Sequence, residues 1–194
     1  MTVRPQRPSA EKTRNKILQA AKTIFLDKGF DGANIKEIAQ AANVNTNLIF
    51  HHFQNKETLW NKVKDFLFDD SYPAPAYKKT SAIAFFKSVI DYRFDVYSSN
   101  PEFANFIKWE PLSKGENELI GTQLYSPIHW LPIIKELQQS GIIIKSVDAK
   151  QIMLFIIFSS YAPFFQNFHV MDEKQIKKYK KMLLNMCCSE FSSL

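Results

Sequence analysis

Two adjacent histidines, His51 and His52, carry the most versatile side chains of this sequence. An imidazole can bind a metal, transfer a proton or contact a phosphate. Three small polar residues stand a few positions ahead of the pair: Asn45, Thr46 and Asn47. Such side chains cap helices or hydrogen-bond the edges of nucleic-acid bases. The stretch therefore suits a metal site, a catalytic histidine or a helix that reads nucleic acid, and the surrounding sequence decides between them.

Metal binding and catalysis both fit this sequence poorly. Neighbouring residues of a helix diverge by about 100°, whereas two histidines that chelate one metal are spaced i, i+4. No cysteine lies near the histidines, because the two cysteines, Cys187 and Cys188, are adjacent near the C-terminus. The sequence also lacks a glycine-rich phosphate loop, a nucleophile motif and paired carboxylates on an evident cleft. We expect no metal, no cofactor and no enzymatic activity.

The net charge of +6 becomes informative once it is located along the chain. Residues 1–64 contain eleven Lys or Arg and five Asp or Glu, whereas residues 65–194 contain fourteen of each kind. All the excess positive charge therefore lies in the first third, where a polyanion such as nucleic acid can be met. A solvated basic face is the alternative that charge by itself leaves open.

The elements around the histidines are typical of a helix-turn-helix. The chain has only five glycines and its apolar residues recur at helical spacing, which predicts an all-α fold. A first helix is expected over residues 10–28, ended by Gly29. Asn34 and Asn45 can each cap a short helix, and Asn43 falls where the turn between them needs a left-handed backbone. Two short helices at this spacing predict the motif.

The apolar sides of these three helices are expected to form one core. Its candidate members are Ile17, Ala21, Ile24, Phe25, Ile35, Ile38, Ala39, Ala42, Val44, Ile49, Phe50 and Phe53.

The rest of the chain also predicts helices. A fourth helix is expected after Asn55 and runs to about residue 68, and the proline-containing segment 71–80 marks a joint between domains. Further helices are predicted over 81–99, 101–112, 117–140, 148–168 and 172–190, the third of them kinked at Pro127 and Pro132. We therefore expect an N-terminal helix-turn-helix domain over 10–55, a linker helix at about 55–70, and a C-terminal helical domain over 71–194.

Membrane and secretory segments are not expected. The longest unbroken apolar core of the segment 152–168 is seven residues, whereas a spanning helix needs about 20. This segment therefore predicts a buried helix. The N-terminus has no apolar stretch of the kind found in a secretory signal, and two adjacent cysteines cannot form a disulfide framework. A reducing, cytoplasmic location is expected.

Four motifs follow one another through the first third of the chain. They are "TRxxIL" from Thr13, "FxxKGF" ending at Phe30, "IAxAAxV" ending at Val44, and "FHHFxNKExL" from Phe50 to Leu59. Residues 10–64 closely resemble the N-terminal DNA-binding domain of the tetracycline-repressor (TetR/AcrR) family of bacterial regulators. Beyond that segment, chain length and helix layout are similar to the family.

The resemblance implies a ligand-responsive transcriptional regulator, and specifically a repressor. Such a protein binds an inverted-repeat DNA operator as a homodimer and is released by a small apolar or aromatic effector. Its C-terminal domain would bind the ligand and form the dimer. A family member that controls the nucleoid or cell division without sensing a ligand is the alternative.

The sequence departs from the family at two places. The family usually has Gly at the position of Asn43, and it often has a Lys/Pro-Gly pair at the positions of Thr46 and Asn47.

By the resemblance, the second short helix reads DNA. Small side chains at its start allow close approach to base edges, Asn47 can pair with an adenine, and Thr46 can bond a base or a phosphate. The histidines occupy the place where the family contacts the DNA backbone. The candidate DNA-binding residues are Lys36, Asn45, Thr46, Asn47, Phe50, His51, His52 and Lys56.

The predicted C-terminal domain is dense in aromatic residues, which suits either a plain core or a site for a hydrophobic ligand. The candidate ligand-binding residues are Phe86, Phe106, Trp109, Glu110, Tyr125, Trp130, Phe158 and Tyr161. Arg93, His129 and Glu110 are further candidate polar anchors, and the charge of the ligand stays open.

The last two predicted helices are expected to form the dimer interface as a four-helix bundle with their counterparts, as in the family. The helix over 148–168 is too apolar to face water alone, which is consistent with this expectation. Burial of the same helix within one chain is the alternative.

Overall fold

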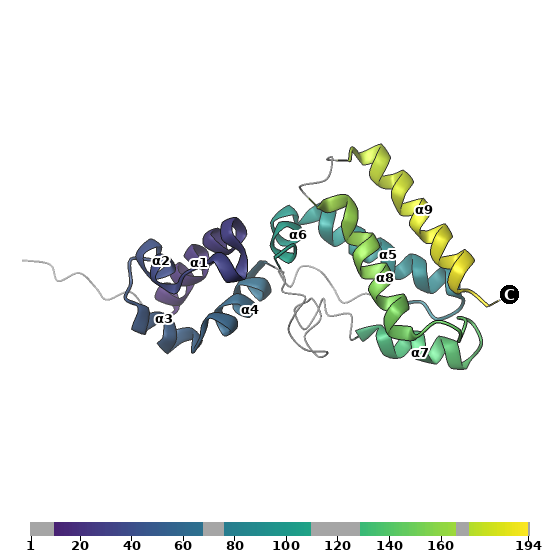
Figure 1. The fold of residues 1–194 in the computed structure, drawn as a ribbon, viewed down its shortest axis with the longest axis horizontal. Helices are drawn as coiled ribbons and strands as arrows, with labels where there is room; N and C mark the ends of the chain where they lie inside the picture. The colour runs from purple at the N-terminus through teal and green to yellow at the C-terminus, as the bar shows by residue number, and fades with distance from the viewer. Residues whose placement is uncertain (1–9, 68–75, 110–128, 166–170, 194) are drawn as a thin grey trace, which may run out of the picture. The chain divides into compact units, whose positions relative to one another are not determined.

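The computed structural model describes residues 10–67, 76–109, 129–165 and 171–193 (Figure 1). It divides into two compact units, described separately below. Unit 1 comprises residues 1–69 and 109–111, and unit 2 comprises residues 70–108 and 112–194. The regular elements of the described residues are helices, together with one isolated antiparallel bridge between Ile143 and Ser192. The predicted all-α class, with a helix-turn-helix in the N-terminal part and helices in the C-terminal part, is confirmed.

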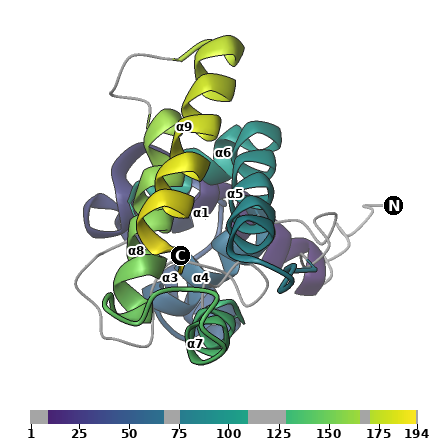
Figure 2. The same ribbon diagram turned by 90° about the vertical axis from the view of Figure 1, so that its right-hand side faces the viewer.

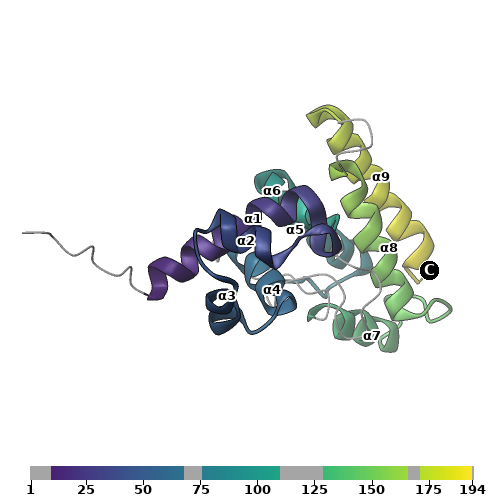
Figure 3. The same cartoon turned by 60° about the vertical axis from the view of Figure 1, so that its left-hand side comes forward.

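Unit 1 is built from four helices: α1 (Ala10–Gly32), α2 (Ile35–Ala41), α3 (Thr46–Phe53) and α4 (Lys56–Leu67). Helix α1 packs against α2 and α4, and α3 packs against α2 and α4, so the four helices enclose one core (Figure 3). Most of the predicted core is confirmed. Its buried members are Ile17, Ala21, Phe25, Ile38, Ala39, Ala42, Ile49 and Phe53, and the core also includes Leu18, Leu59, Trp60 and Val63, which were not predicted. The predicted core residues Ile24, Ile35 and Val44 are only partly covered.

Gly29 interrupts α1, as predicted, although helical structure resumes and reaches Gly32. Its backbone has φ 70° and ψ −173°, a conformation that residues with a Cβ rarely adopt. The Trp109 indole lies directly against it, since a Cβ at Gly29 would stand 2.6 Å from the indole Cε3. Trp109 Nε1 also donates a hydrogen bond of 3.1 Å to the carbonyl of Leu26. Trp109 therefore belongs to the packing of unit 1.

Unit 2 contains α5 (Ala82–Ser99), α6 (Pro101–Ile107), α7 (Leu131–Gln139), α8 (Ala149–Tyr161), the short 3-10 helix η2 (Ala162–Phe164) and α9 (Glu173–Phe191). Helices α5, α8 and α9 pack against one another, while α7 packs on α8 and α6 contacts α5 and η2 (Figures 1 and 2). Three of these helices are capped by side chains: Ser81, Asn100 and Asp148 each accept a hydrogen bond from a backbone N–H of the first turn.

Three predicted helices in unit 2 were too long or misplaced. Helix α6 ends at Ile107 rather than at residue 112. Helix α8 ends at Tyr161, before residue 168, because Pro163 cannot continue the α-helical hydrogen bonds and the chain turns into η2. Pro132 does not kink a long helix but lies in the first turn of α7, where a proline is tolerated. The predicted kink at Pro127 lies outside the described residues.

The apolar helix α8 is largely buried within unit 2. Ala149, Ile152, Met153, Ile156 and Ile157 are all buried against neighbouring helices. No helix in the described part of the chain is long and apolar enough to cross a membrane. The prediction of a buried helix in place of a spanning one is thus confirmed for these residues.

Candidate nucleic-acid interface

Three asparagines set the geometry of the turn between α2 and α3. The side chain of Asn34 accepts a hydrogen bond of 2.9 Å from the backbone N–H of Lys36 and so caps α2. Asn45 caps α3 in the same way, accepting a bond of 2.8 Å from Leu48 N. Between them Asn43 takes a left-handed backbone with φ 52°, which Asn tolerates better than other residues that carry a Cβ. All three predictions are confirmed, so the local sequence fixes the turn.

Helix α3 has a buried side and an exposed side. Ile49 and Phe53 are buried, each about 1% exposed, and hold the helix on the core. The helical repeat places Asn47, Phe50 and His51 together on another face. Phe50 was considered for the core, but it is 45% exposed. The exposed face of α3 therefore carries an amide, an aromatic ring and an imidazole, which can contact base edges, thymine methyl groups and phosphates.

The two histidines lie side by side on α3, with ring centroids 5.5 Å apart. His52 also lies beside the Phe53 ring, and the Arg14 guanidinium of α1 stands 5.4 Å from the centroid of that ring. Burial lowers the pKa of His52 below its ordinary value of 6.5, and the charges of His51 and Arg14 lower it further. His52 therefore takes up a proton less readily in the free protein than an isolated imidazole does.

The candidate lysines occupy different helices. Lys36 is exposed in the first turn of α2. Lys56 begins α4, and its Nζ lies 4.6 Å from the centroid of the Phe30 ring of α1. Helix α4 is capped by Asn55, whose side chain accepts a bond of 2.7 Å from Thr58 N, as predicted.

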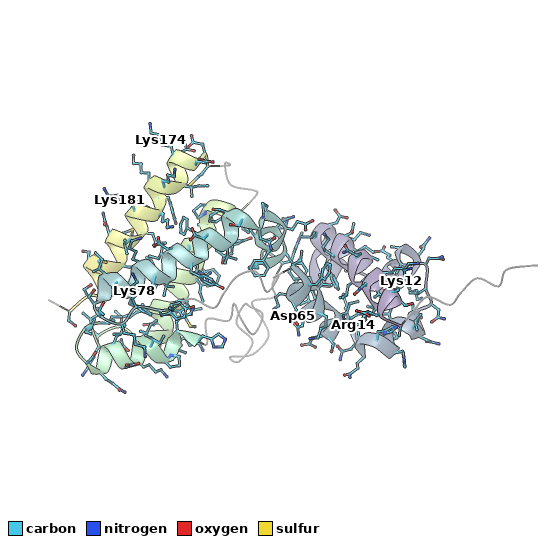
Figure 4. The ribbon with its side chains drawn as sticks, turned by 180° about the vertical axis from the view of Figure 1, so that it is seen from behind. Lys12, Arg14, Asp65, Lys78, Lys174 and Lys181 are labelled. Carbon is cyan, nitrogen blue, oxygen red and sulfur yellow. The ribbon has the colours of Figure 1, made fainter. Side chains whose placement is uncertain are left out.

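Arg14 is a candidate that the sequence did not single out. It adds a cation from α1 next to the histidines of α3, and Figure 4 shows it on the same unit as Lys12. The available signal was its place near the start of a helix within the basic third of the chain. Its proximity to His52 depends on how α1 and α3 are placed on their common core, which spacing along the sequence does not reveal.

The candidate ligand-binding residues do not share one environment. Phe86, Phe106 and Trp130 are fully buried core residues of unit 2. Tyr161 is half-buried, and its hydroxyl donates to the carbonyl of Ala104 over 2.9 Å. Phe158 is 46% exposed. Trp109 packs against Gly29 in unit 1. Glu110 and Tyr125 lie outside the described residues.

The candidate polar anchors also differ in their surroundings. Arg93 is buried, and its guanidinium donates to the Ser160 hydroxyl and to the Tyr97 hydroxyl, each over 2.6 Å. His129 is exposed. Within the ranges that the structure describes, no three His, Cys, Asp or Glu side chains cluster so as to hold a metal ion.

A capped helix-turn-helix with a polar exposed face, set in the basic part of the chain, defines a DNA-binding regulatory protein. The family model described as "Bacterial regulatory proteins, tetR family" matches residues 17–63, which span α1 to α4. Over residues 17–63 the chain is thus similar to the DNA-binding domain of TetR-family transcriptional regulators.

Known proteins with similar sequences are regulators as well. The HTH-type transcriptional repressor NicS of Pseudomonas putida is 29% identical over 109 residues, 55% of this chain and 51% of NicS. The match thus spans about half the length of NicS. The icaADBC biofilm-operon negative transcriptional regulator IcaR of Staphylococcus aureus is 26% identical over 187 residues, 89% of this chain and 97% of IcaR.

The fold has close counterparts among solved structures. A putative tetR-family transcription regulator from Shewanella sp. PV-4 superposes with a TM-score of 0.68 at 16% identity, covering 94% of this chain and 99% of that one. At that identity the likeness concerns the fold alone.

Proposed function

We propose that the protein represses transcription by binding an inverted-repeat operator as a homodimer and leaves the DNA when a small apolar or aromatic effector binds. The observation that carries the proposal is the exposed face of α3, which begins at the Asn45 cap and presents Asn47, Phe50 and His51. NicS and IcaR are named as a repressor and a negative regulator, which favours repression over activation.

Recognition divides between two groups of side chains. Thr46 and Asn47 occupy the first turn of α3, where short side chains let the backbone approach the base edges in the major groove. The phosphate contacts come from Lys36, Lys56, His51 and His52, which flank that turn on α2, α3 and α4. Phosphate contacts fix the protein on the duplex, whereas base contacts select the sequence.

Dimerisation is supported by apolar side chains left exposed on the last two helices. Phe158 of α8, Met182 of α9 and Met186 of α9 are 46%, 48% and 44% exposed. Met182 and Met186 are spaced i, i+4, so they share one face of α9. Neighbouring helices that expose large apolar side chains gain stability when a second copy covers them. The proposed interface is this face of α8 and α9.

An effector site is supported by the aromatic packing of unit 2. The Tyr97 ring centroid lies 5.5 Å from that of Tyr161 and 5.2 Å from that of Phe164, and Phe94 lies 5.5 Å from Phe164. Aromatic walls with a few polar groups suit an apolar or aromatic ligand. The second candidate function is a regulator with the same DNA-binding unit and a closed aromatic core that senses nothing.

DNA recognition is tested by selecting duplexes from a random pool and measuring their affinity across a range of salt concentrations. We expect an inverted repeat to emerge. Asn47→Ala should lower its affinity by about 1–3 kcal/mol and relax one base position. Lys56→Gln should weaken all sequences alike and flatten the salt dependence by about one unit. Equal binding of every duplex at physiological salt would refute sequence-specific recognition.

Sensing is tested separately. Compounds that raise the thermal stability of the protein are titrated with and without the selected operator. Linkage requires an effector that weakens DNA binding to bind less tightly when operator is present, by the same factor. Identical ligand affinities in the two titrations would favour the non-sensing regulator and would leave the DNA-binding proposal intact.

A further inference from the structure

A hollow of about 230 Å³ lies between α5 and α9 in unit 2, away from the DNA-binding residues in sequence. Four lysines line it: Lys87 from α5 and Lys177, Lys180 and Lys181 from α9. Its other lining residues are Asp91, Ile90 and Leu184. The hollow thus combines a strongly basic rim with two apolar side chains.

The carboxylate of Asp91 pairs with two of the four lysines. Asp91 forms ion pairs with Lys87 and with Lys180, the latter over 2.9 Å, and Lys180 also lies 3.7 Å from Asp95. Burial by itself would raise the pKa of Asp91, but hydrogen bonds and charge from these two lysines outweigh it and hold the pKa below its usual range. Asp91 is therefore ionised at neutral pH and fixes the two ammonium groups at the wall of the hollow.

The other half of the rim carries charge that the described residues do not neutralise. Lys177 and Lys181 form no ion pair with any carboxylate in the described ranges. They are spaced i, i+4 on α9 and so share one side of the helix. Figure 4 shows Lys181 on the outer surface of α9, with Lys174 further towards the start of the helix. The lining residues, four lysines and Asp91, have an excess of three positive charges, and Asp95 beside Lys180 reduces it to two.

The hollow and the proposed dimer face occupy different sides of α9. At about 100° per residue, Lys177 and Leu184 lie nearly opposite to Met182 and Met186 around the helix axis. A second copy that covers the methionines therefore leaves the lysine side accessible.

We propose that this lysine hollow binds a small phosphorylated organic molecule. Lysine ammonium groups bind phosphate as point charges, and several of them around one space match an anion that carries two or more negative charges. Ile90 is buried and Leu184 is half-buried, so the wall offers apolar contact to the organic part of the ligand. The site is separate from the aromatic cluster and does not depend on the proposed effector response.

The test uses the intact protein and phenyl phosphate, with inorganic pyrophosphate as a second probe that has charge but no apolar group. Isothermal titration should give one saturable site per chain for both probes. The methyl resonances of Ile90 and Leu184 should shift during the phenyl phosphate titration, because both side chains line the hollow.

Two double variants of equal charge separate a site from general electrostatics. Lys177→Gln with Lys181→Gln removes the unneutralised half of the rim and should weaken phenyl phosphate binding about tenfold or more. Lys174→Gln with Lys178→Gln changes the same helix by the same charge outside the hollow and should change affinity less than about twofold.

Three results would each overturn the proposal. One is the absence of saturable binding at millimolar probe concentration, and another is an equal loss of affinity in the two double variants. The third is that the wild-type protein binds neither probe and the double variant at Lys177 and Lys181 loses affinity for duplex DNA. In that case the basic surface would bind nucleic acid.

Discussion

Lowering the pH should strengthen operator binding through His52. In the free protein the pKa of His52 is depressed below 6.5 by burial and by the charges of His51 and Arg14. A DNA phosphate beside the imidazole opposes these effects and raises the pKa, because it favours the charged form. The complex then binds more protons than the free protein between the two pKa values, so affinity increases as the pH falls through that window.

The size of the effect follows from the number of protons involved. Uptake of one proton limits the slope of log Kd against pH to about one. Each unit by which DNA raises the pKa of His52 makes binding at low pH about tenfold tighter, which corresponds to about 1.4 kcal/mol. We therefore expect roughly tenfold tighter binding at about pH 5.5 than at about pH 8. Fluorescence anisotropy with the selected operator, at constant ionic strength, measures this difference.

Protein stability should respond to pH with the opposite sign. Because the pKa of His52 is lower in the folded protein than the unfolded value near 6.5, the unfolded state binds more protons. The contribution of His52 to stability is therefore fully present above about pH 6.5 and is lost as the pH falls through the folded pKa. Thermal melts of the free protein should show this loss, and operator should reduce it.

Two variants make the pH prediction decisive. His52→Gln should reduce the pH dependence of DNA binding to the share of the other proposed phosphate contact, His51, whereas His129→Gln, at an exposed histidine of unit 2, should leave it unchanged. A wild-type affinity that does not change with pH would refute the reasoning. Equal slopes for the wild type and His52→Gln would refute the role of His52.

Three further predictions concern the dimer and the fold. Met186→Asp should give monomers in sedimentation velocity without loss of helical circular dichroism. Asn185→Asp, which makes the same charge change at a neighbouring exposed position, should stay dimeric, and a wild type that is monomeric at micromolar concentration would contradict the interface. Gly29→Ala should lower the free energy of unfolding by about 2 kcal/mol, because the backbone φ is positive there and the new Cβ would collide with the Trp109 indole. Gly32→Ala should change the free energy of unfolding little, and equal urea midpoints for the two variants would contradict this reasoning. Asn43→Gly should raise the free energy of unfolding by about 0.5 kcal/mol and Asn43→Ala should lower it, because the backbone φ of 52° suits Gly better than Asn and Asn better than Ala. The opposite order of stability in urea denaturation would contradict a left-handed backbone at this position.

The sequence by itself determined the DNA-reading motif, because its geometry depends on interactions between near neighbours. The side chains of Asn34 and Asn45 reach backbone N–H groups two and three residues ahead, and the backbone of Asn43 depends on its own sterics. Such interactions have fixed offsets along the chain, so the spacing of the asparagines could be read directly. The same local rule located the start of α4, which Asn55 caps.

Helix ends and aromatic positions in unit 2 were harder to predict. Phe86 and Phe158 both lie in helices that contain many apolar residues, yet the first is fully buried and the second is exposed. Helical periodicity identifies sides of a helix, but the neighbours that cover each side come from distant parts of the chain. The early end of α8 followed from Pro163, a local signal that the length of the apolar run concealed.

Only the tertiary structure decided which distant groups act on one another. Arg14 lowers the pKa of His52 because α1 and α3 are held on one core, and Lys180 meets Asp91 because α9 lies along α5. Trp109 rests on Gly29 although eighty residues of chain separate them. Contacts of this kind have no fixed spacing, since they depend on how whole helices pack to bury apolar surface, and that packing sets the electrostatics of the DNA-binding face and of the lysine hollow.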